Sequence, residues 1–524
     1  MSDLRLAYTT QNWALTKPAA RGRRGIVVSQ SREAAEAGVA ILQAGGNAID
    51  AAVATALALA AAEPWNSGLG GVGFALVHRT GQKFAEVVDF GPVAPAALDA
   101  SAFRLTGRMK QDLFAWPEVE DDANIHGPLS FAIPSATAGY AHMHHLWGRL
   151  PIAEVVAPAI ALAKRGLPQD WFTTLKIAFS ASALRRYPES ARIYLPAGLP
   201  PVPPYQGTPG FFRLGALSDT LEQLARAGLR DQYDGEIAAA IVSDTKDVGG
   251  VLSAADLRGC HPRVRPATSF ACSGYEVQMA GGLTAAPTMQ RVLEQMREVA
   301  PRGTPDAEWF VALGQALKRA YAERLAGLGD AETKAGETCT THLTVCDAEG
   351  TMVALTSTLL SSMGSRVVLP RSGILMNNGI MWFDSRPGQP NSIGGGKRPL
   401  TNMSPVILRK QDRPWLAAGA SGGRRILASI LQLVAFVADF GMELDKAAHH
   451  PRIDVSDPDR ISVDARMPAD IVQALAAAGP LSVVEHGVMP INFACPNGIV
   501  ISPDGTRIGI SDVAQPWSAA VAQP

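Results

Sequence analysis

Thr340-Thr-His-Leu-Thr-Val-Cys346 and Met352-Val-Ala-Leu-Thr-Ser-Thr358 are two β-rich stretches, separated by the turn Asp347-Ala-Glu-Gly350. This pattern predicts a β-hairpin. If residues 348–350 form the common three-residue loop, with Gly350 in the left-handed conformation, Thr340 faces Thr358 across the hairpin. Two hydroxyl groups are then expected side by side at the open end of the two strands.

The segment before the hairpin, Gly329–Glu337, is polar and has no apolar periodicity, which predicts an exposed connection. Cleavage of the chain before Thr340 would create an N-terminal threonine. The α-amine of such a residue has a pKa near about 8, so it can take the proton of its own hydroxyl at neutral pH. Thr340 is therefore a candidate nucleophile.

Outward from the hairpin, apolar periodicity and turn signals predict a series of further elements. We expect strands at Gly25–Ser29, Phe74–His78 and Trp415–Ala418, and helices at Ser31–Gln43, Ala48–Ala62, Ile152–Arg165, Thr220–Ala227, Asp306–Ala326 and Arg425–Phe440.

A glycine-rich segment, Gly68-Leu-Gly-Gly-Val-Gly73, matches the G-x-G-x-x-G pattern of dinucleotide sites. That pattern requires a strand before the glycines and a helix after them, so that the helix dipole meets the pyrophosphate. Here the helix comes first and the strand follows. The segment is interpreted as a tight packing loop, and no cofactor is expected.

A second motif, Gly419-Ala-Ser-Gly-Gly423, matches G-x-S-x-G between a strand and a helix, which is the context of a serine nucleophile elbow. His449, His450 and His486 lie downstream and are candidates to complete a triad with Ser421. Alternatively, the paired glycines present backbone N–H groups to an anion, with no nucleophile at Ser421. The motif alone leaves both hypotheses open.

The composition excludes several classes of protein. The 524 residues carry 47 Lys and Arg against 48 Asp and Glu, without a basic stripe, which disfavours nucleic-acid or membrane-surface binding. This length corresponds to about three to four domain-sized units or to one large α/β body. The five cysteines form no CxxC pair and no His/Cys cluster, so neither a disulfide scaffold nor a metal site is expected: Cys260, Cys272, Cys339, Cys346 and Cys495.

The amino-terminal segment has no apolar run before its basic cluster, so it does not resemble a secretory signal, and a cytoplasmic location is expected. The Ala-rich stretch Ala48–Ala62 is too short to span a bilayer and is predicted to be a buried helix.

Six segments of the chain together resemble the γ-glutamyltransferase (γ-glutamyltranspeptidase) family. They occur in the family's order, between about residues 25 and 455: Gly45–Val53, Glu63–Gly71, Thr340–Thr344, Gly373–Asn378, Lys397–Pro405 and Ser421–Arg424.

The resemblance implies an N-terminal-nucleophile hydrolase with a four-layer αββα sandwich. It implies a zymogen that cuts its own Cys339–Thr340 bond, giving a large subunit of residues 1–339 and a small subunit of residues 340–524 that stay together as a heterodimer. The family's supporting threonine corresponds to Thr358. Its oxyanion-hole glycines correspond to Gly422 and Gly423, which weakens the hypothesis of a Ser421 nucleophile.

The chain departs from the family at the positions that recognise a γ-glutamyl group. Gly91 stands where an arginine grips the α-carboxylate, and Thr401-Asn402 replace a Ser-Ser pair that also binds it. The family's three partners of the α-ammonium correspond to Leu360, Gly379 and Trp382. These departures are closer to oxamate amidohydrolases and cephalosporin acylases than to true γ-glutamyltransferases.

The sequence thus predicts a self-processing amidohydrolase that acts on a small, non-γ-glutamyl amide with water as the acyl acceptor. Thr401, Asn402 and the Arg424-Arg425 pair remain candidate partners for a short carboxylate. Three alternatives stay open: an authentic γ-glutamyltransferase or glutathione hydrolase, a serine hydrolase using Ser421, and a non-catalytic binding protein.

Overall fold

The computed structural model describes residues 13–109, 116–272, 274–299, 301–328, 339–457 and 459–524. The segment Gly329–Glu337, for which an exposed connection was predicted, lies outside the described residues.

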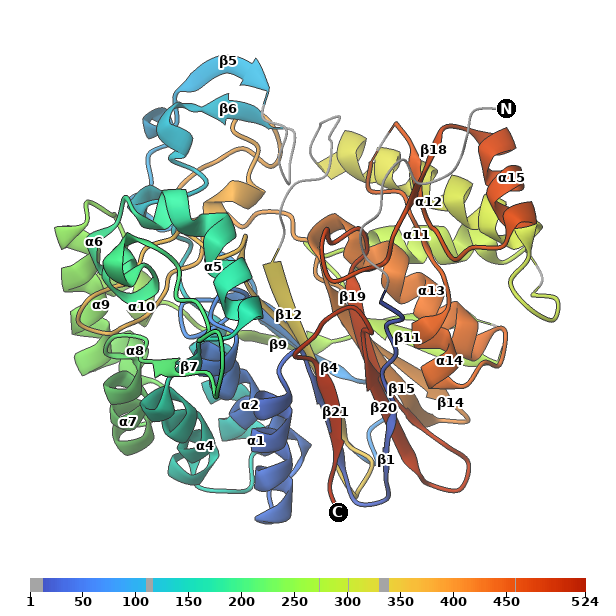
Figure 1. Ribbon diagram of the computed structural model, residues 1–524, viewed down its shortest axis with the longest axis horizontal. Coiled ribbons are helices and arrows are strands. Elements are labelled where there is room, and N and C mark those ends of the chain that lie inside the picture. The colour runs from blue at the N-terminus through green and yellow to red at the C-terminus, as the bar shows by residue number, and fades with distance from the viewer. Residues whose placement is uncertain (1–12, 110–115, 273, 300, 329–338, 458) are drawn as a thin grey trace.

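Two seven-stranded antiparallel sheets stack face to face at the centre of the molecule (Figure 1). The first sheet has the order β1 (Ala20–Gly22), β20 (Arg507–Ser511), β19 (Cys495–Ile501), β15 (Arg413–Ser421), β14 (Val406–Lys410), β11 (Tyr275–Met279) and β10 (Thr268–Cys272). The second has the order β21 (Ala519–Ala522), β2 (Ile26–Ser29), β12 (Cys339–Cys346), β13 (Met352–Leu360), β3 (Val72–His78), β4 (Glu86–Phe90) and β9 (Arg263–Pro266).

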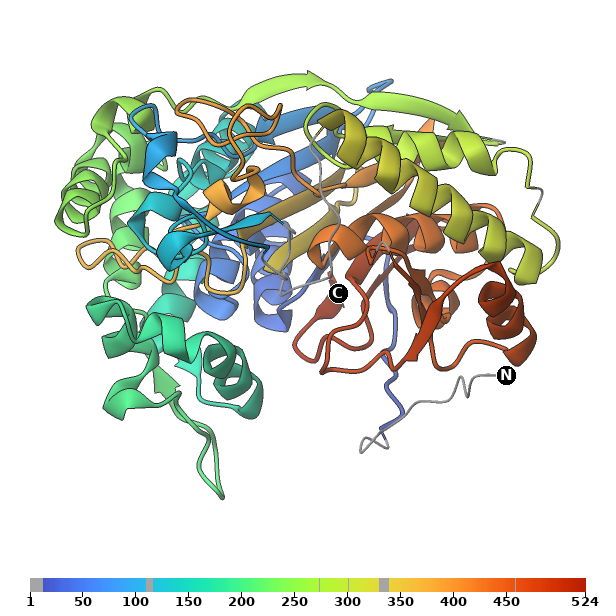
Figure 2. The ribbon, with the colours of Figure 1, turned by 90° about the horizontal axis from the view of Figure 1, so that it is seen from above.

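Helices cover the outer face of each sheet (Figures 1 and 2). On the side of β12 and β13 lie α1 (Arg32–Gln43), α2 (Ala48–Ala62), α3 (Ala136–Trp147), α4 (Ile152–Arg165), α5 (Trp171–Leu184), α6 (Pro188–Tyr194), α7 (Leu217–Ala227), α8 (Asp231–Asp234), α9 (Glu236–Asp247) and α10 (Ala254–Arg258). On the side of β15 lie α11 (Ala286–Met296), α12 (Ala307–Leu328), α13 (Ile426–Ala438), α14 (Leu444–His449) and α15 (Ala469–Ala478). This arrangement confirms the predicted αββα sandwich.

Three smaller sheets lie outside the two central sheets of the sandwich in the described residues. They comprise β16 (Ile453–Asp454), β17 (Ile461–Asp464) and β18 (Leu481–Val484), the pair β5 (Leu105–Met109) and β6 (Pro117–Val119), and the pair β7 (Leu167–Pro168) and β8 (Phe211–Phe212).

The helix α2 shows how the sequence directs this layering. All of its residues are buried, because alanine side chains let neighbouring elements approach closely. Asn47 caps the helix by accepting the N–H groups of Ile49 and Asp50, and Asp50 completes the capping box. The buried helix packs on β12 and β13 and ends at Glu63, beside the strand ends that carry the candidate nucleophile.

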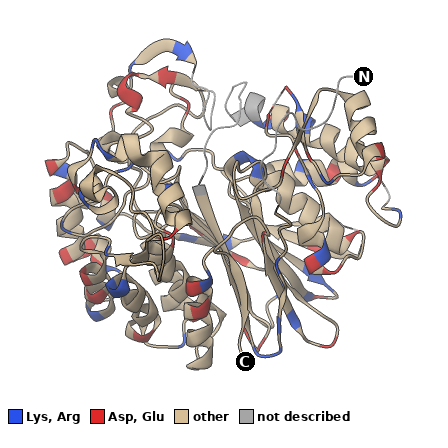
Figure 3. Cartoon of the chain, viewed as in Figure 1, with Lys and Arg blue, Asp and Glu red and all other residues tan. Residues whose placement is uncertain are grey.

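Charged side chains of both signs are interspersed over the helical layers in the view of Figure 3, and the central sheets carry few of them. Among the described helices, none is long and apolar enough to cross a membrane.

Candidate active site

The predicted hairpin of β12 and β13 forms with the expected register. Residues pair from Thr341 with Ser357 to Cys346 with Met352, and Gly350 in the loop has a φ of 87°. A bulge interrupts the ladder between Cys339 and Thr341, where Thr340 of β12 lies opposite two residues of β13. The two hydroxyl groups still meet, because Thr340 Oγ1 donates to Thr358 Oγ1 over 3.4 Å, while the Leu360 N–H donates to Thr358 Oγ1 over 2.8 Å.

A buried histidine fastens this hairpin to the facing sheet. His342 Nδ1 lies 2.9 Å from Thr356 Oγ1, and its Nε2 lies 3.2 Å from Thr344 Oγ1. Burial lowers the pKa of His342 to about 3, so the imidazole is neutral. A Cβ at Gly419 in β15 would overlap the imidazole ring, so the close stacking of the two sheets requires glycine there.

The loop that joins β15 to α13 carries the two glycines for which an oxyanion role was predicted. Gly422 and Gly423 have φ values of 132° and 57°, which L side chains rarely adopt. A Cβ at Gly422 would lie 2.7 Å from Ala494 Cα. The strand–turn–helix context predicted for this motif is therefore confirmed, and β12 begins at the same end of the sandwich (Figure 1).

Ser421 is buried and accepts a hydrogen bond from the side chain of Gln30. The three candidate triad histidines are engaged with other groups. His449 Nε2 accepts the Lys17 N–H over 3.1 Å, His450 Nδ1 lies 2.8 Å from the Pro451 carbonyl, and His486 Nε2 lies 3.2 Å from Asp512 Oδ1. None of these contacts assembles a triad with Ser421.

An apolar cluster includes two of the three positions where the family's ammonium partners were expected, and one of them, Leu360, donates its N–H to Thr358. Leu360 and Trp382 are buried in one cluster together with Met381 and Met403. At Gly379 a Cβ would lie 2.6 Å from Ala132 Cβ, so the backbone packs too closely there for any side chain.

The guanidinium of Arg398 occupies the space beside Gly91. A Cβ at Gly91 would lie 2.8 Å from Arg398 Nη2 and 2.6 Å from Phe74 Cζ, and Arg398 forms an ion pair with Asp89. An arginine at position 91 would therefore displace Arg398.

Thr401 and Asn402, two of the candidate partners for a carboxylate, form hydrogen bonds with other groups of the protein. The hydroxyl of Thr401 donates to the Leu283 carbonyl over 2.9 Å, and Arg324 Nη2 donates to the Thr401 carbonyl over 2.6 Å and to Asn402 Oδ1 over 3.4 Å. Arg425 Nη1 donates to the Ile491 carbonyl over 2.9 Å. Among the predicted carboxylate partners, the Thr401 hydroxyl thus donates its hydrogen bond to a backbone carbonyl.

Residues 68–71 of the glycine-rich segment form a loop between α2 and β3, as predicted, and Val72 and Gly73 already belong to β3. A Cβ at Gly70 or Gly73 would clash with the carbonyl oxygens of Leu375 and Thr356 respectively. Within the described ranges, no group of three His, Cys, Asp or Glu side chains is arranged to hold a metal ion.

Comparison with known proteins decides the family. The model of the family described as gamma-glutamyltranspeptidase matches residues 34–338 and 331–522. The chain is 30% identical over 534 residues to the acylase ACY 1 proenzyme of Pseudomonas sp. (strain V22), covering 94% of this chain and 92% of the relative. The chain belongs to the gamma-glutamyltranspeptidase family. It is therefore an enzyme, an N-terminal-nucleophile amidohydrolase, rather than the non-catalytic binding protein considered above.

Within the gamma-glutamyltranspeptidase family, relatives of different activity are equally similar. The glutathione hydrolase proenzyme of Escherichia coli (strain K12) is 29% identical over 548 residues, covering 94% of this chain and 90% of the relative. The crystal structure of cephalosporin acylase from Bacillus halodurans aligns with a TM-score of 0.85 at 24% identity and covers 99% of both chains, which shows a shared fold.

Two buried charged residues near the site had no role in the sequence interpretation. Glu63 lies in one of the segments that resemble the family, and an acidic residue at the end of an Ala-rich, buried helix signals a buried carboxyl. Arg324 continues the buried face of α12, after Leu313, Leu317 and Tyr321 at helical spacing, and this periodicity is the signal for it.

Proposed function

We propose that this protein is a self-processing amidohydrolase whose nucleophile is Thr340 and whose acyl substrate is not a γ-glutamyl group. The observation that carries the proposal is the contact between the Thr340 and Thr358 hydroxyls at the start of β12. Family membership supports the reaction class.

Processing comes first in this mechanism. The Thr340 hydroxyl attacks the carbonyl carbon of Cys339, the peptide C–N bond breaks as an ester forms, and the proton passes to the freed amine. Water then hydrolyses the ester. The products are the subunits 1–339 and 340–524, which remain associated as a heterodimer.

Turnover uses the amine that processing releases. This amine takes the hydroxyl proton as Thr340 attacks the substrate amide, and it gives the proton to the leaving amine. The N–H groups of Gly422 and Gly423 stabilise the tetrahedral oxyanion. Water releases the acyl group from Thr340.

The substrate assignment rests on the apolar cluster beside the threonines. A γ-glutamyl head is a zwitterion, and a charge removed from water without a partner costs several kcal/mol. Leu360 and Trp382 are buried in an apolar cluster and offer no charged partner to the ammonium. These features favour a small or acylase-type amide over glutathione.

A second candidate function, glutathione hydrolysis, is favoured by the similarity to the Escherichia coli glutathione hydrolase proenzyme. It requires that groups other than those at positions 91, 360, 379 and 382 bind the two charges of the glutamyl head.

Processing is tested by intact mass and N-terminal sequencing. The active protein is expected as two chains, the smaller beginning at Thr340. Thr340→Ala is expected to stay uncut and inactive, whereas Ser421→Ala is cut normally. An active preparation that contains only full-length chain would refute the mechanism.

The substrate class is tested with three anilides. The γ-glutamyl and glutaryl anilides differ only in the α-ammonium, and the butyryl anilide lacks the carboxylate as well. Loss of two charge-assisted contacts, at about 1.5–3 kcal/mol each, predicts a kcat/KM for the γ-glutamyl compound about two to four orders of magnitude below that of efficient family members. A γ-glutamyl anilide that is hydrolysed faster than the other two establishes the second candidate. The cytoplasmic location stays a prediction, and cell fractionation tests it.

A further inference from the structure

The turn that follows α2 touches both strands that carry the threonines. The Leu359 N–H of β13 donates to the Asn66 carbonyl over 2.9 Å, and the Met363 N–H donates to the Trp65 carbonyl over 2.9 Å. From β12, the Thr341 hydroxyl donates to Glu63 Oε2 over 3.0 Å. One short turn therefore braces the residues next to Thr340 and Thr358.

Glu63 is the centre of this turn and is completely buried. Besides Thr341, its carboxyl accepts Asn66 Nδ2 over 2.7 Å and Gln515 Nε2 over 3.3 Å. The cation that acts on it is Lys176 of α5, itself buried. Three donors and one cation thus face a single carboxyl group.

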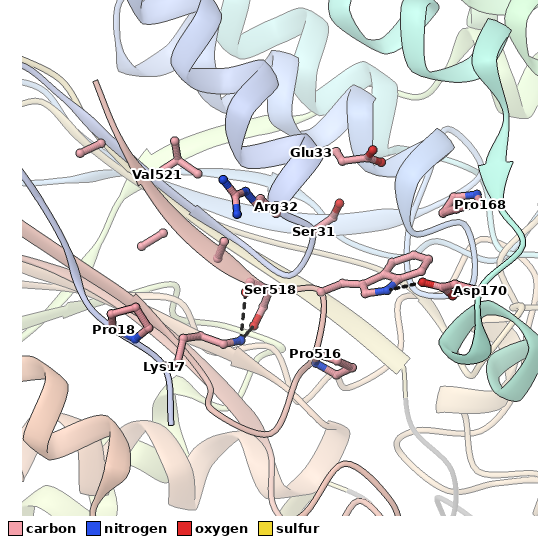
Figure 4. Close-up of a pocket in the computed structure, with 14 residues that line it drawn as sticks. Lys17, Pro18, Ser31, Arg32, Glu33, Pro168, Asp170, Pro516, Ser518 and Val521 are labelled. Atoms are coloured by element: carbon pink, nitrogen blue, oxygen red, sulfur yellow. Dashed lines mark hydrogen bonds between the residues drawn. The ribbon is translucent and has the colours of Figure 1, made fainter. Parts of the chain in front are cut away.

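Lys17, which lines the pocket shown in Figure 4, anchors the segment that carries Gln515. The ammonium of Lys17 donates to the Gln515 carbonyl over 2.6 Å and to Ser518, so it fixes the segment that supplies one donor to Glu63. The titratable groups whose charges act on Lys17 are Asp512 and the partly buried thiol of Cys495.

The network continues to the glycine loop of the facing sheet. Asn66 Nδ2 also donates to Gln30 Oε1 over 3.4 Å, and Gln30 Nε2 donates to Ser421, the residue before Gly422. Hydrogen bonds thereby connect the nucleophile's strand to the candidate oxyanion loop through Asn66 and Gln30.

We propose that Glu63 is a positioning residue whose ionised carboxylate holds Thr340 and the Gly422 loop in their catalytic arrangement, so that its protonation switches the site off. This inference rests on the proposed function, because it assumes that Thr340 is the nucleophile. Thr341, Asn66 and Gln515 all donate to Glu63, and the ionised carboxylate accepts all three bonds. A protonated carboxyl would add an O–H donor to a site where these three neighbours are already donors.

Burial makes this switch operate near neutral pH. Burial raises the pKa of Glu63 to about 7, opposed by Lys176 and by the hydrogen bonds from Thr341, Asn66 and Gln515. Both forms of Glu63 are therefore populated in the range where the Thr340 amine also titrates.

The experiment is the pH profile of kcat/KM of the cleaved protein with its best anilide substrate. In the native protein, two groups titrate on the acid side, so the acid limb is steeper than a single ionisation. Glu63→Gln is expected to lower the plateau about tenfold through misplacement of Thr340, and to leave a shallower limb that reports the ionisation of the Thr340 amine alone. Thr341→Val removes a hydrogen bond that favours the carboxylate, so its limb is expected to move to higher pH.

Asp439→Asn is the matched control. Asp439 is another carboxyl whose pKa burial raises, and it binds Tyr275 at the far end of α13. Its variant should keep the native profile. Plateau losses in both Glu63→Gln and Thr341→Val, with the acid limb keeping its native steepness and position, would overturn the proposal and leave Glu63 a purely structural residue. If Glu63→Gln does not fold, Thr341→Val decides alone.

Intact mass of each preparation separates failure of this inference from failure of the proposed function. A Thr340→Ala variant that is cut and active refutes the proposed function. If activity depends on Thr340 but the acid limb of the pH profile is the same in Glu63→Gln and Thr341→Val as in the native protein, only the role of Glu63 is refuted.

Discussion

The Thr358 hydroxyl oxygen accepts hydrogen bonds from the Thr340 hydroxyl and from the Leu360 N–H. The second bond holds the Thr358 side chain against the backbone of its own strand. Thr356, two residues earlier on the same face, is bonded instead to His342. Neighbouring threonines of one strand therefore have different tasks. Thr358 contacts the candidate nucleophile, and Thr356 holds the imidazole of His342, which packs against Gly419 of the opposite sheet.

Thr358→Ala is expected to slow both self-cleavage and turnover, because a lost catalytic hydrogen bond typically costs about 2–4 kcal/mol of barrier. Thr356→Ala is expected to lower stability more than rate. Cleavage rates by mass spectrometry, kcat and thermal unfolding of the two variants distinguish these effects. Equal rate losses at both positions would contradict the assignment of the supporting role to Thr358.

The β15–α13 junction depends on backbone conformations that only glycine adopts easily. Ser421 ends the strand, Gly422 and Gly423 turn the chain, and α13 begins at Ile426. Gly422 has no room for a side chain because Ala494 packs against its Cα hydrogen. Gly441, after the other end of α13, has a φ of 64° with open space around it.

Gly422→Ala and Gly441→Ala separate backbone strain from steric overlap. Gly441→Ala is expected to cost about 1 kcal/mol of the free energy of unfolding and no activity, because it pays only for the left-handed backbone. Gly422→Ala adds an overlap with Ala494 and shifts a candidate oxyanion N–H, so we expect a larger stability loss and about 100-fold lower kcat. Chemical denaturation and kcat measure both, and a Gly422→Ala enzyme with native kcat would argue against the oxyanion role.

One buried carboxyl, that of Glu63, makes the global stability of the protein depend on pH. The unfolded chain gives Glu63 its ordinary pKa of 4.5, and the folded protein raises the pKa to about 7. Between these values the folded state binds more protons, so this contribution to the free energy of unfolding is complete below the lower pKa and is lost as pH rises through the higher one. The ionised form of Glu63 that is proposed to support catalysis is therefore the form that lowers the free energy of unfolding.

Glu63→Gln is expected to remove this pH dependence. The free energy of unfolding of the native protein minus that of the variant should fall by about 3 kcal/mol between pH 4.5 and 8, at 1.36 kcal/mol per pKa unit. Urea unfolding at several pH values measures the difference, and taking it against the variant cancels the titration of other groups. A difference that does not change with pH would contradict a raised pKa at Glu63.

Local patterns predicted much of the fold but not the neighbours of the site. The hairpin register follows from a turn with a left-handed Gly350, and the helix over residues 307–328 follows from its apolar spacing. The bulge beside Thr340 has no sequence signature, because it is set by how the strand end fits its surroundings. The resemblance predicted which contacts are missing, but Arg398 at Gly91 and Gln515 at Glu63 are contacts between residues far apart in the chain.

The order of the strands has a consequence for assembly if the chain is cut at Thr340. β2 of the larger fragment is inserted between β12 and β21 of the smaller one, and β1 pairs with β20 in the other sheet. The fragments could not separate without breaking ladders in both sheets, so the cut heterodimer should persist under dilution. Refolding would differ between the cut and the uncut protein. Two separate chains must associate in a bimolecular step, whereas in the uncut chain the covalent link keeps the two parts at a fixed local concentration. The bond before Thr340 would thus act as an assembly tether that is needed only once, and recovery of the cut enzyme from denaturant should depend on protein concentration while that of uncut Thr340→Ala should not.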